Sequence, residues 1–396
     1  MRVAFLTAGG LAPCLSASIA YLIKEYSKIG DSVEFIGYKN GYKGLLVGQK
    51  ISIPNTVRSK TDLLASYGGS PIGNSRVKLS NIDDCINNNY IDEKQIPLEV
   101  ASHQLKDDKI DILHTIGGDD TNTSAGELVQ YSKINNYNLT VVGLPKTVDN
   151  DIYPIKQTLG AYTAAEQGAI FFNNIVNENT TSSRQLIIHE VMGRNCGWLT
   201  AATAYQYRKK LFNREFIPEL LIDQAKWDIH AIYLPEKKIN FINECDRLNR
   251  IIDTHDCVNI FLSEGAGLDS IINEMKANNE EIRYDAFGHI RLDEINPGQW
   301  FAKNFKKKLN ADKVLVQKSG YFARSAAPNS DDRKLIEQTS KVAVKSALNS
   351  NSGVVGIDEE NNQKLSCIDF KRIKGGKPFD TTSEWFTKML NDIGQK

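Results

Sequence analysis

Short runs of apolar residues alternate with longer amphipathic stretches along the chain. The apolar runs that predict buried strands lie at residues 3–7, 33–36, 110–116, 139–144, 185–188 and 258–262. The amphipathic stretches that predict helices lie near residues 15–28, 122–134, 159–178 and 196–208. Such alternation is typical of βαβ units, in which helices cover a parallel sheet. The pattern therefore predicts an α/β fold.

The same pattern recurs beyond residue 160, which indicates a second half of the same class. The chain has 396 residues, and single cores stop growing near ~250–300 residues. We therefore expect two Rossmann-like, three-layer α/β/α domains. Ligand sites in such proteins commonly lie between domains, so the active site is expected in the cleft between them.

Composition limits the possible partners. The chain carries 48 basic and 48 acidic residues, so no global charge attracts nucleic acid or an anionic membrane, and any anion site must be local. The six cysteines are scattered without a C-x-x-C pair, which favours small buried side chains in a reducing compartment. No apolar run approaches the ~18–20 residues of a membrane span. Gly9-Gly10 and Pro13 interrupt the only run that imitates a signal peptide, so a cytoplasmic protein is expected.

Two loops that follow predicted strands concentrate the candidate chemistry. They are Gly117–Thr121, which reads G-G-D-D-T, and Pro145–Asp151, which reads P-K-T-V-D-N-D. Open α/β sheets bind ligands at the carboxyl ends of their strands, where both loops lie. Glycines let the backbone approach an anion closely, and the unpaired N–H groups of a starting helix can face phosphate oxygens. The loops predict a site for a polyphosphate and its metal ion.

Each loop also has a purely structural interpretation. Asp119 is a candidate ligand for Mg²⁺, but an aspartate here can equally act as the N-cap of a helix. The pattern Ser124-x-x-Glu127 predicts a capping box in the first turn of that helix. Asp149 and Asp151 share one face of an extended loop, where one can act as a base. An Asx turn is the alternative, and it competes more strongly for Asp151 than for Asp149.

Taken with further motifs, these loops resemble the phosphofructokinase family, in its pyrophosphate-dependent branch. The matching segments follow the family's order through most of the chain, at residues 7–13, 41–45, 73–76, 117–120, 145–151, 190–194, 263–267 and 320–324. The resemblance implies reversible transfer of a phosphoryl group from diphosphate to the 1-hydroxyl of fructose 6-phosphate. The products would be fructose 1,6-bisphosphate and phosphate, in glycolysis or gluconeogenesis.

The resemblance implies a role for each matching residue. Asp149 matches the base that takes the proton of the 1-hydroxyl, Thr147 a hydroxyl near the transferred group, and Arg194 a cation that offsets developing charge. Asp119 matches the aspartate associated with Mg²⁺. The implied diphosphate-binding and donor-selecting residues are Gly9, Arg76, Gly118, Asp120 and Lys146. The implied sugar-phosphate contacts are Thr147, Val148, Asp149, Met192, Gly193, Arg194, Glu264, Tyr321, Phe322, Ala323 and Arg324.

The choice of donor has a physical argument. ATP-using relatives have glycine at the positions of Asp120 and Lys146. A carboxylate at 120 would stand where the α-phosphate of ATP must pass, and two like charges at ~4 Å cost ~1 kcal/mol in water and about 4 kcal/mol at an effective dielectric constant of 20. Steric exclusion adds to this repulsion, and Lys146 supplies a cation for a compact, highly charged donor. Diphosphate is therefore the expected donor.

The resemblance also implies a division of labour. Residues 1–160, with a returning segment near 322–368, form the phosphoryl-donor domain. Residues 161–321, with the C-terminal segment 369–396, form the fructose 6-phosphate domain. A homodimer or homotetramer is implied, because the family shares its sugar site between subunits. Arg184 and Lys318 are candidates for contacts at that shared site.

Two other functions stay open at the level of sequence. One is a kinase that uses ATP or acts on a different sugar phosphate. The other is a non-catalytic, sugar-phosphate-binding subunit, against which the intact Asp149, Asp119, Thr147 and Arg194 argue.

Overall fold

The computed structural model describes residues 1–283 and 295–395. The chain divides into two compact units. Unit 1 comprises Met1–Thr163 and Arg324–Lys377, and unit 2 comprises Ala164–Ala323 and Pro378–Lys396. These divisions follow Thr163, Ala323 and Lys377, whereas the divisions expected from the sequence followed residues 160, 321 and 368.

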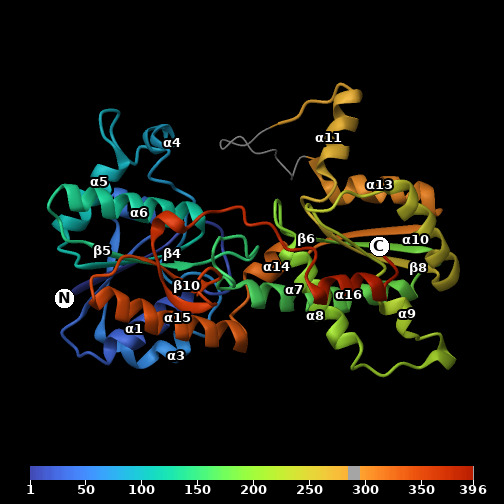
Figure 1. The fold of residues 1–396 in the computed structure, drawn as a ribbon, viewed down its shortest axis with the longest axis horizontal. Helices are drawn as coiled ribbons and strands as arrows, with labels where there is room; N and C mark the ends of the chain where they lie inside the picture. The colour runs from blue at the N-terminus through green and yellow to red at the C-terminus, as the bar shows by residue number, and fades with distance from the viewer. Residues whose placement is uncertain (284–294, 396) are drawn as a thin grey trace. The chain divides into compact units, whose positions relative to one another are not determined.

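Unit 1 is built on a seven-stranded sheet with the order β11-β10-β5-β4-β1-β2-β3 (Figure 1). Its strands are β1 (Arg2–Thr7), β2 (Glu34–Tyr38), β3 (Lys50–Ile53), β4 (Ile112–Gly117), β5 (Thr140–Pro145), β10 (Gly353–Asp358) and β11 (Lys364–Ile368). Only the edge strands β3 and β11 pair antiparallel; the other pairings are parallel. Parallel strands are buried on both faces, which explains their continuous apolar sequences.

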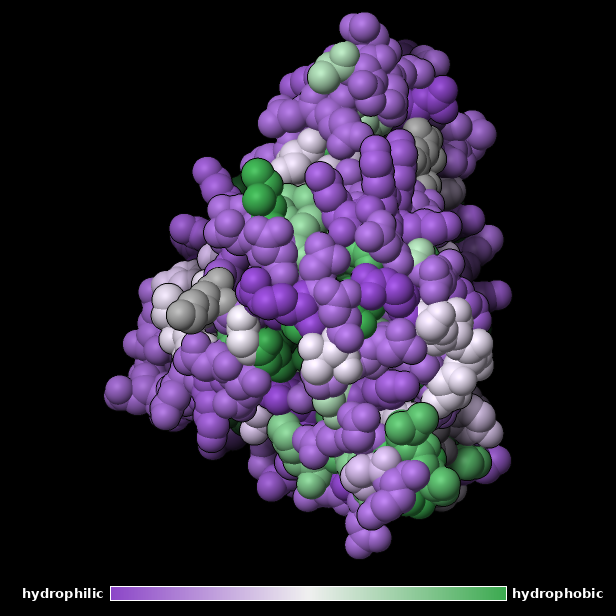
Figure 2. All heavy atoms as spheres, turned by 90° about the vertical axis from the view of Figure 1, so that its right-hand side faces the viewer, coloured by the Kyte–Doolittle hydropathy of each residue, from purple (hydrophilic) through white to green (hydrophobic). Residues whose placement is uncertain are grey.

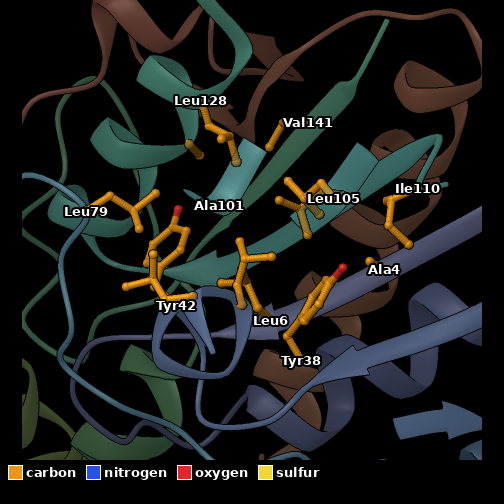
Figure 3. Packing of buried hydrophobic residues seen from close by; sticks show 14 of the residues in the cluster. Ala4, Leu6, Tyr38, Tyr42, Leu79, Ala101, Leu105, Ile110, Leu128 and Val141 are labelled. Atoms are coloured by element: carbon orange, nitrogen blue, oxygen red, sulfur yellow. The ribbon is translucent and has the colours of Figure 1, made fainter. Parts of the chain in front are cut away.

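Helices cover both faces of this sheet (Figure 1). They are α1 (Leu15–Ser27), α2 (Tyr42–Leu46), α3 (Thr61–Leu64), α4 (Ile82–Asn87), α5 (Pro97–Asp107), α6 (Asp119–Ile134) and α15 (Ser330–Leu348), with 3₁₀ turns at Asn55–Lys60 and Phe370–Arg372. Leu105 of α5 and Leu128 of α6 pack with Leu6 and Val141 of the sheet (Figure 3). This apolar layer fixes the carboxyl ends of β1, β4 and β5, where the candidate loops begin.

Unit 2 has a four-stranded parallel sheet with the order β7-β8-β6-β9. The strands are β6 (Gln185–Val191), β7 (Ala231–Tyr233), β8 (Cys257–Ser263) and β9 (Lys313–Lys318). The helices are α7 (Ala161–Ile175), α8 (Trp198–Leu211), α9 (Gln224–Trp227), α10 (Phe241–His255), α11 (Leu268–Ala277), α13 (Pro297–Leu309), α14 (Gly320–Arg324) and α16 (Glu384–Asp392), with 3₁₀ turns at Val176–Thr180 and Pro218–Leu220. Phe301 and Phe305 of α13 pack against Tyr233 and Ile260 in its core.

The predicted α/β class is confirmed, since each unit has a sheet of mainly or entirely parallel strands together with helices. One local prediction is wrong. Because α6 begins at Asp119, Ser124 lies inside the helix and is buried, so Ser124 and Glu127 form no capping box. Gly118 is extended and takes the N-cap position, which lets the helix start directly after the strand.

The face of unit 2 drawn in Figure 2 is mostly hydrophilic, with apolar side chains in small separate patches. Within residues 1–283 and 295–395, no helix has the length and apolar character needed to cross a membrane.

Candidate active site

The loop after β1 is held in place by backbone hydrogen bonds. Ala8 N–H donates to the Ile116 carbonyl at 3.0 Å, and Gly9 N–H donates to the Ser75 carbonyl at 2.8 Å. Gly9 has a φ of +86°, and a Cβ there would lie 3.0 Å from Lys146 Nζ. Any other residue at this position would therefore be strained and would crowd the lysine.

Lys146 links the loop after β5 to the loop after β1. Its N–H donates to the Gly117 carbonyl at 2.8 Å, and its Nζ donates to the Gly10 carbonyl at 2.5 Å. The residue is 3% exposed, and burial lowers its pKa to about 8. At neutral pH it is a buried cation beside glycine backbone, which is a local anion site in a chain without net charge.

The start of α6 adds backbone donors to this region. The first helical hydrogen bond runs from Asn122 N–H to the Gly118 carbonyl at 3.1 Å, and the Asn122 amide also donates to the carbonyls of Gly117 and Gly118 at 3.1 and 2.8 Å. The N–H groups of residues 119–121 lie before that first bond and point out of the helix end. With the positive end of the helix dipole, they favour an anionic ligand.

Asp120 is not a lone negative charge. Its carboxylate lies 2.6 Å from Lys78 Nζ and is 56% exposed. The lysine offsets much of the repulsion that a free carboxylate would exert on a nucleotide. Exclusion of a bulky donor at this position therefore has to rest more on the size of the side chain than on its charge.

The P-K-T-V-D-N-D loop is shaped by Asn150, which the sequence interpretation left without a role. Asn150 has a left-handed φ of +57°. Its side-chain oxygen accepts from Thr158 N–H at 2.8 Å, and its amide donates to the Lys156 carbonyl at 3.1 Å. Asp149 N–H donates to Thr147 Oγ1 at 3.1 Å. The Asn150 side chain thus bonds backbone groups six and eight residues further along the chain, which differs from the local bonding of an Asx turn.

Asp119 and Asp151 form a pair of carboxylates. Burial and the nearby Asp119 raise the pKa of Asp151, while a hydrogen bond from Thr147 acts in the opposite direction. Among residues 1–283 and 295–395, the Asp119 carboxylate has no hydrogen bond or ion pair. Two close carboxylates of this kind fit a divalent cation, because Mg²⁺ on phosphates is usually held by one or two carboxylates.

The loops after β6 and β8 pack together in unit 2. Gly193 N–H donates to Glu264 Oε1 at 3.3 Å, and Ser263 Oγ donates to the Gly193 carbonyl at 2.5 Å. A Cβ at Gly265 would lie 1.7 Å from the Arg194 carbonyl oxygen. Burial raises the pKa of Glu264, and the Gly193 N–H acts in the opposite direction. These contacts fix Met192–Arg194 and Glu264 as one polar group.

A cavity of about 640 Å³ lies beside this group within unit 2. Arg194 and Gly265 line one side of it, and the Glu236–Ile239 loop after β7 lines another. The cavity sits at the carboxyl ends of the parallel strands, which is the expected place for a ligand in an open sheet.

Comparison with known proteins identifies the family. A family model described as "Phosphofructokinase" matches residues 2–347. The chain belongs to the phosphofructokinase family. It is 54% identical to the pyrophosphate–fructose 6-phosphate 1-phosphotransferase of Methylotuvimicrobium alcaliphilum, across 100% of this chain and 96% of that protein. It is 52% identical to the protein of the same name from Propionibacterium freudenreichii, across 100% of this chain and 98% of that protein.

A solved structure shares the fold. The pyrophosphate-dependent phosphofructokinase from Marinobacter aquaeolei matches with a TM-score of 0.71 and 19% identity, covering 100% of this chain and 92% of that one. Enzymes of the phosphofructokinase family generally need a divalent metal ion, which agrees with the pair of carboxylates in unit 1.

The last family motif lies on α14. Tyr321 is 79% exposed and Phe322 is 48% exposed, with the Phe322 ring 5.7 Å from that of Phe171. Ala323 is buried and its N–H donates to the Ser319 carbonyl at 2.8 Å. Arg324 ends the helix.

Arg184 and Lys318 have structural partners in unit 2. The Arg184 guanidinium donates to the carbonyls of Leu309 and Asn310 and pairs with Asp253 at 2.7 Å. It thereby caps the end of α13, where free carbonyls favour a cation. Lys318 Nζ lies 2.8 Å from Glu190 Oε1. These contacts hold the Arg184 side chain against the end of α13 and against Asp253.

Proposed function

We propose that this member of the phosphofructokinase family is a diphosphate-dependent 6-phosphofructokinase. It would transfer a phosphoryl group from diphosphate to O1 of fructose 6-phosphate, releasing phosphate and fructose 1,6-bisphosphate, in a reversible reaction. The observation that carries the choice of donor is Lys146, a buried cation bonded to the loop after β1. The names of the relatives at 54% and 52% identity agree with this donor.

Diphosphate would bind where unit 1 presents cationic and backbone donors together. Lys146 and Arg76 supply positive charge, Gly9 and Gly118 let the backbone approach, and the first N–H groups of α6 face the phosphate oxygens. Asp120 excludes a nucleotide mainly by occupying space, because its charge is offset by Lys78. A compact donor fits such a site and a nucleoside triphosphate does not.

Asp119 and Asp151 would hold Mg²⁺, because burial and the neighbouring Asp119 raise the pKa of Asp151, and a cation beside the two carboxylates would offset that cost. When bound, the metal ion supplies positive charge on the diphosphate oxygens. Asp149 is the residue proposed for proton transfer, and its backbone N–H donates to Thr147 Oγ1 at 3.1 Å.

Asp149 would take the proton of the sugar 1-hydroxyl as that oxygen attacks the phosphoryl group. Thr147 would contact the transferred group, and Lys146 and Arg194 would stabilise the negative charge that develops. Phosphoryl transfer needs little covalent chemistry from the protein, so positioning and charge account for most of the catalysis. The proposed sugar-phosphate contacts are Thr147, Val148, Asp149, Met192, Gly193, Arg194, Glu264, Tyr321, Phe322, Ala323 and Arg324.

One assay tests the proposal. Phosphate release from diphosphate is measured in the presence of Mg²⁺ before and after adding fructose 6-phosphate, with ATP tested in parallel as the donor. We expect release that depends on the sugar phosphate and on diphosphate. Asp149→Ser should abolish turnover while fructose 6-phosphate still binds in calorimetry. Preference for ATP would overturn the choice of donor, and sugar binding without any turnover by the wild type would favour a non-catalytic subunit.

We also infer that the enzyme works as a homodimer or homotetramer, because structures of the family are generally oligomeric. Light scattering on the purified protein measures this directly. A monomer with full activity would contradict it.

A further inference from the structure

The last residues of unit 1 run along the loop that carries Asp151. Tyr153 N–H donates to the Lys374 carbonyl at 2.8 Å, and Lys374 N–H donates to the Tyr153 carbonyl at 3.0 Å. Lys377 N–H donates to the Asp151 carbonyl at 2.9 Å. The segment Lys374–Lys377 is therefore paired to the Asp151–Tyr153 backbone by three hydrogen bonds, and we call it the strap.

Within the strap, Gly375 faces the other carboxylate of the pair. A Cβ at Gly375 would lie 1.8 Å from Asp119 Oδ2 and 2.5 Å from Asp119 Cγ. Real Cβ atoms essentially never approach another heavy atom within 3.0 Å, so the Asp119 carboxylate occupies the space of a missing side chain. The neighbouring Gly376 differs: its φ is +76° and nothing lies within 4 Å of its Cβ position. Glycine at 375 thus leaves room for the Asp119 carboxylate, and glycine at 376 permits a positive φ.

The strap thus contacts the Asp119 carboxylate through Gly375 and the Asp151 backbone through Lys377. The Asp119 carboxylate has no hydrogen bond or ion pair in the described part of the chain, and it packs against Gly375. Like charges repel, and two carboxylates in a poorly solvated site move apart unless the protein or a cation holds them. Lys377 adds a positive charge near Asp151, and its Nζ lies 3.3 Å from Glu359.

We propose that the strap is a positioning element that sets the distance between the Asp119 and Asp151 carboxylates for a divalent cation, and that Gly375 is the residue that determines this distance. The inference rests on the proposed function for the identity of the site, but it concerns metal binding rather than turnover. Groups that orient metal ligands typically change metal affinity by roughly 10- to 100-fold when they are altered.

Direct metal binding tests the proposal. Binding of Mn²⁺ is followed by electron paramagnetic resonance in the presence of diphosphate and without any sugar phosphate. We expect Gly375→Ala to weaken Mn²⁺ binding by roughly 10- to 100-fold, because the methyl group must displace the Asp119 carboxylate. Gly376→Asn is the matched control, since asparagine tolerates a left-handed φ, and it should bind Mn²⁺ like the wild type. Fructose 6-phosphate binding should be unchanged in both.

A double-mutant cycle separates positioning from general damage. In an Asp119→Ala background no carboxylate remains to be displaced, so adding Gly375→Ala should cost little further Mn²⁺ affinity. An equal loss in both backgrounds, or wild-type binding by Gly375→Ala, would overturn the proposal. Failure of the wild type to bind Mn²⁺ with diphosphate would overturn the strap and the proposed function together. Normal binding without phosphoryl transfer to the sugar would overturn the proposed function alone.

Discussion

At the scale of single residues, Lys146 predicts how activity depends on pH. A lysine carries charge only below its pKa, and burial lowers the pKa of Lys146 to about 8. As the pH rises through about 8, the free enzyme therefore loses the cation that attracts diphosphate, and affinity should fall by up to ~10-fold per pH unit. Calorimetric titration with magnesium diphosphate across this range measures the loss.

Lys146→Met is the control for that titration. This variant should bind diphosphate weakly at every pH. Its plot of affinity against pH should lack the change of slope near pH 8, because no titrating ammonium group remains. Diphosphate itself also gains and loses protons. If the affinity of this variant still changed slope near pH 8, Lys146 would not be the cause of that change.

Substitutions of Asp120 can distinguish the effect of its charge from the effect of its size on the choice of donor. Lys78 lies 2.6 Å from its carboxylate, and partly exposed pairs of this kind leave little net field for a passing anion. We expect Asp120→Asn, which keeps the size but removes the charge, to stay selective for diphosphate. Asp120→Gly combined with Lys146→Gly should gain ATP use. The ratio of kcat/KM for diphosphate to kcat/KM for ATP measures the selectivity of each variant. If Asp120→Asn used ATP, charge repulsion would be the main cause of the selectivity.

At the scale of elements, Asn150 predicts the cost of reshaping the catalytic loop. Asn150→Ala loses the bonds to Thr158 and Lys156. It also replaces asparagine, which tolerates a left-handed φ, by alanine, for which that conformation costs about 1–2 kcal/mol. Asn150→Gly loses the same bonds without that strain. We expect kcat to fall in both variants, and to fall further in Asn150→Ala than in Asn150→Gly. The KM for fructose 6-phosphate should change little. Equal kcat in wild type and alanine would show that the loop holds its shape without Asn150.

The elements themselves were predictable wherever burial imposes a pattern. Strands such as β1, β4 and β5 are apolar runs because both faces of a parallel sheet are covered, and the sequence locates them to within a few residues. The edge strands β3 and β11 carry polar residues and gave no such signal. The start of α6 was misplaced because the polar stretch after Gly118 resembles a loop, whereas its aspartates occupy the first helical turn.

At the scale of the whole molecule, the candidate residues were predictable but their partners were not. The loops with Asp119, Lys146 and Asp149 follow strands, so their place at a sheet edge follows from the alternation of elements. Nothing local indicates that Gly375 lies against Asp119, or that Lys78 pairs with Asp120, because these contacts join distant parts of the chain. Loop residues far apart in sequence carry no shared periodicity from which such pairs could be read.

The division into two units predicts that the two substrates can be disturbed separately. Glu264 belongs to unit 2, where it bonds Gly193 N–H, and the diphosphate candidates belong to unit 1. Glu264→Gln should weaken fructose 6-phosphate binding by ~1.5–3 kcal/mol, the usual value of a hydrogen bond to a charged group, which is about 10- to 150-fold in Kd. Diphosphate binding should stay as in the wild type. Lys146→Met should show the reverse pattern in the same calorimetric experiments. If either variant impaired both ligands equally in the absence of the other ligand, the assignment of Glu264 to the sugar phosphate and of Lys146 to diphosphate would be wrong.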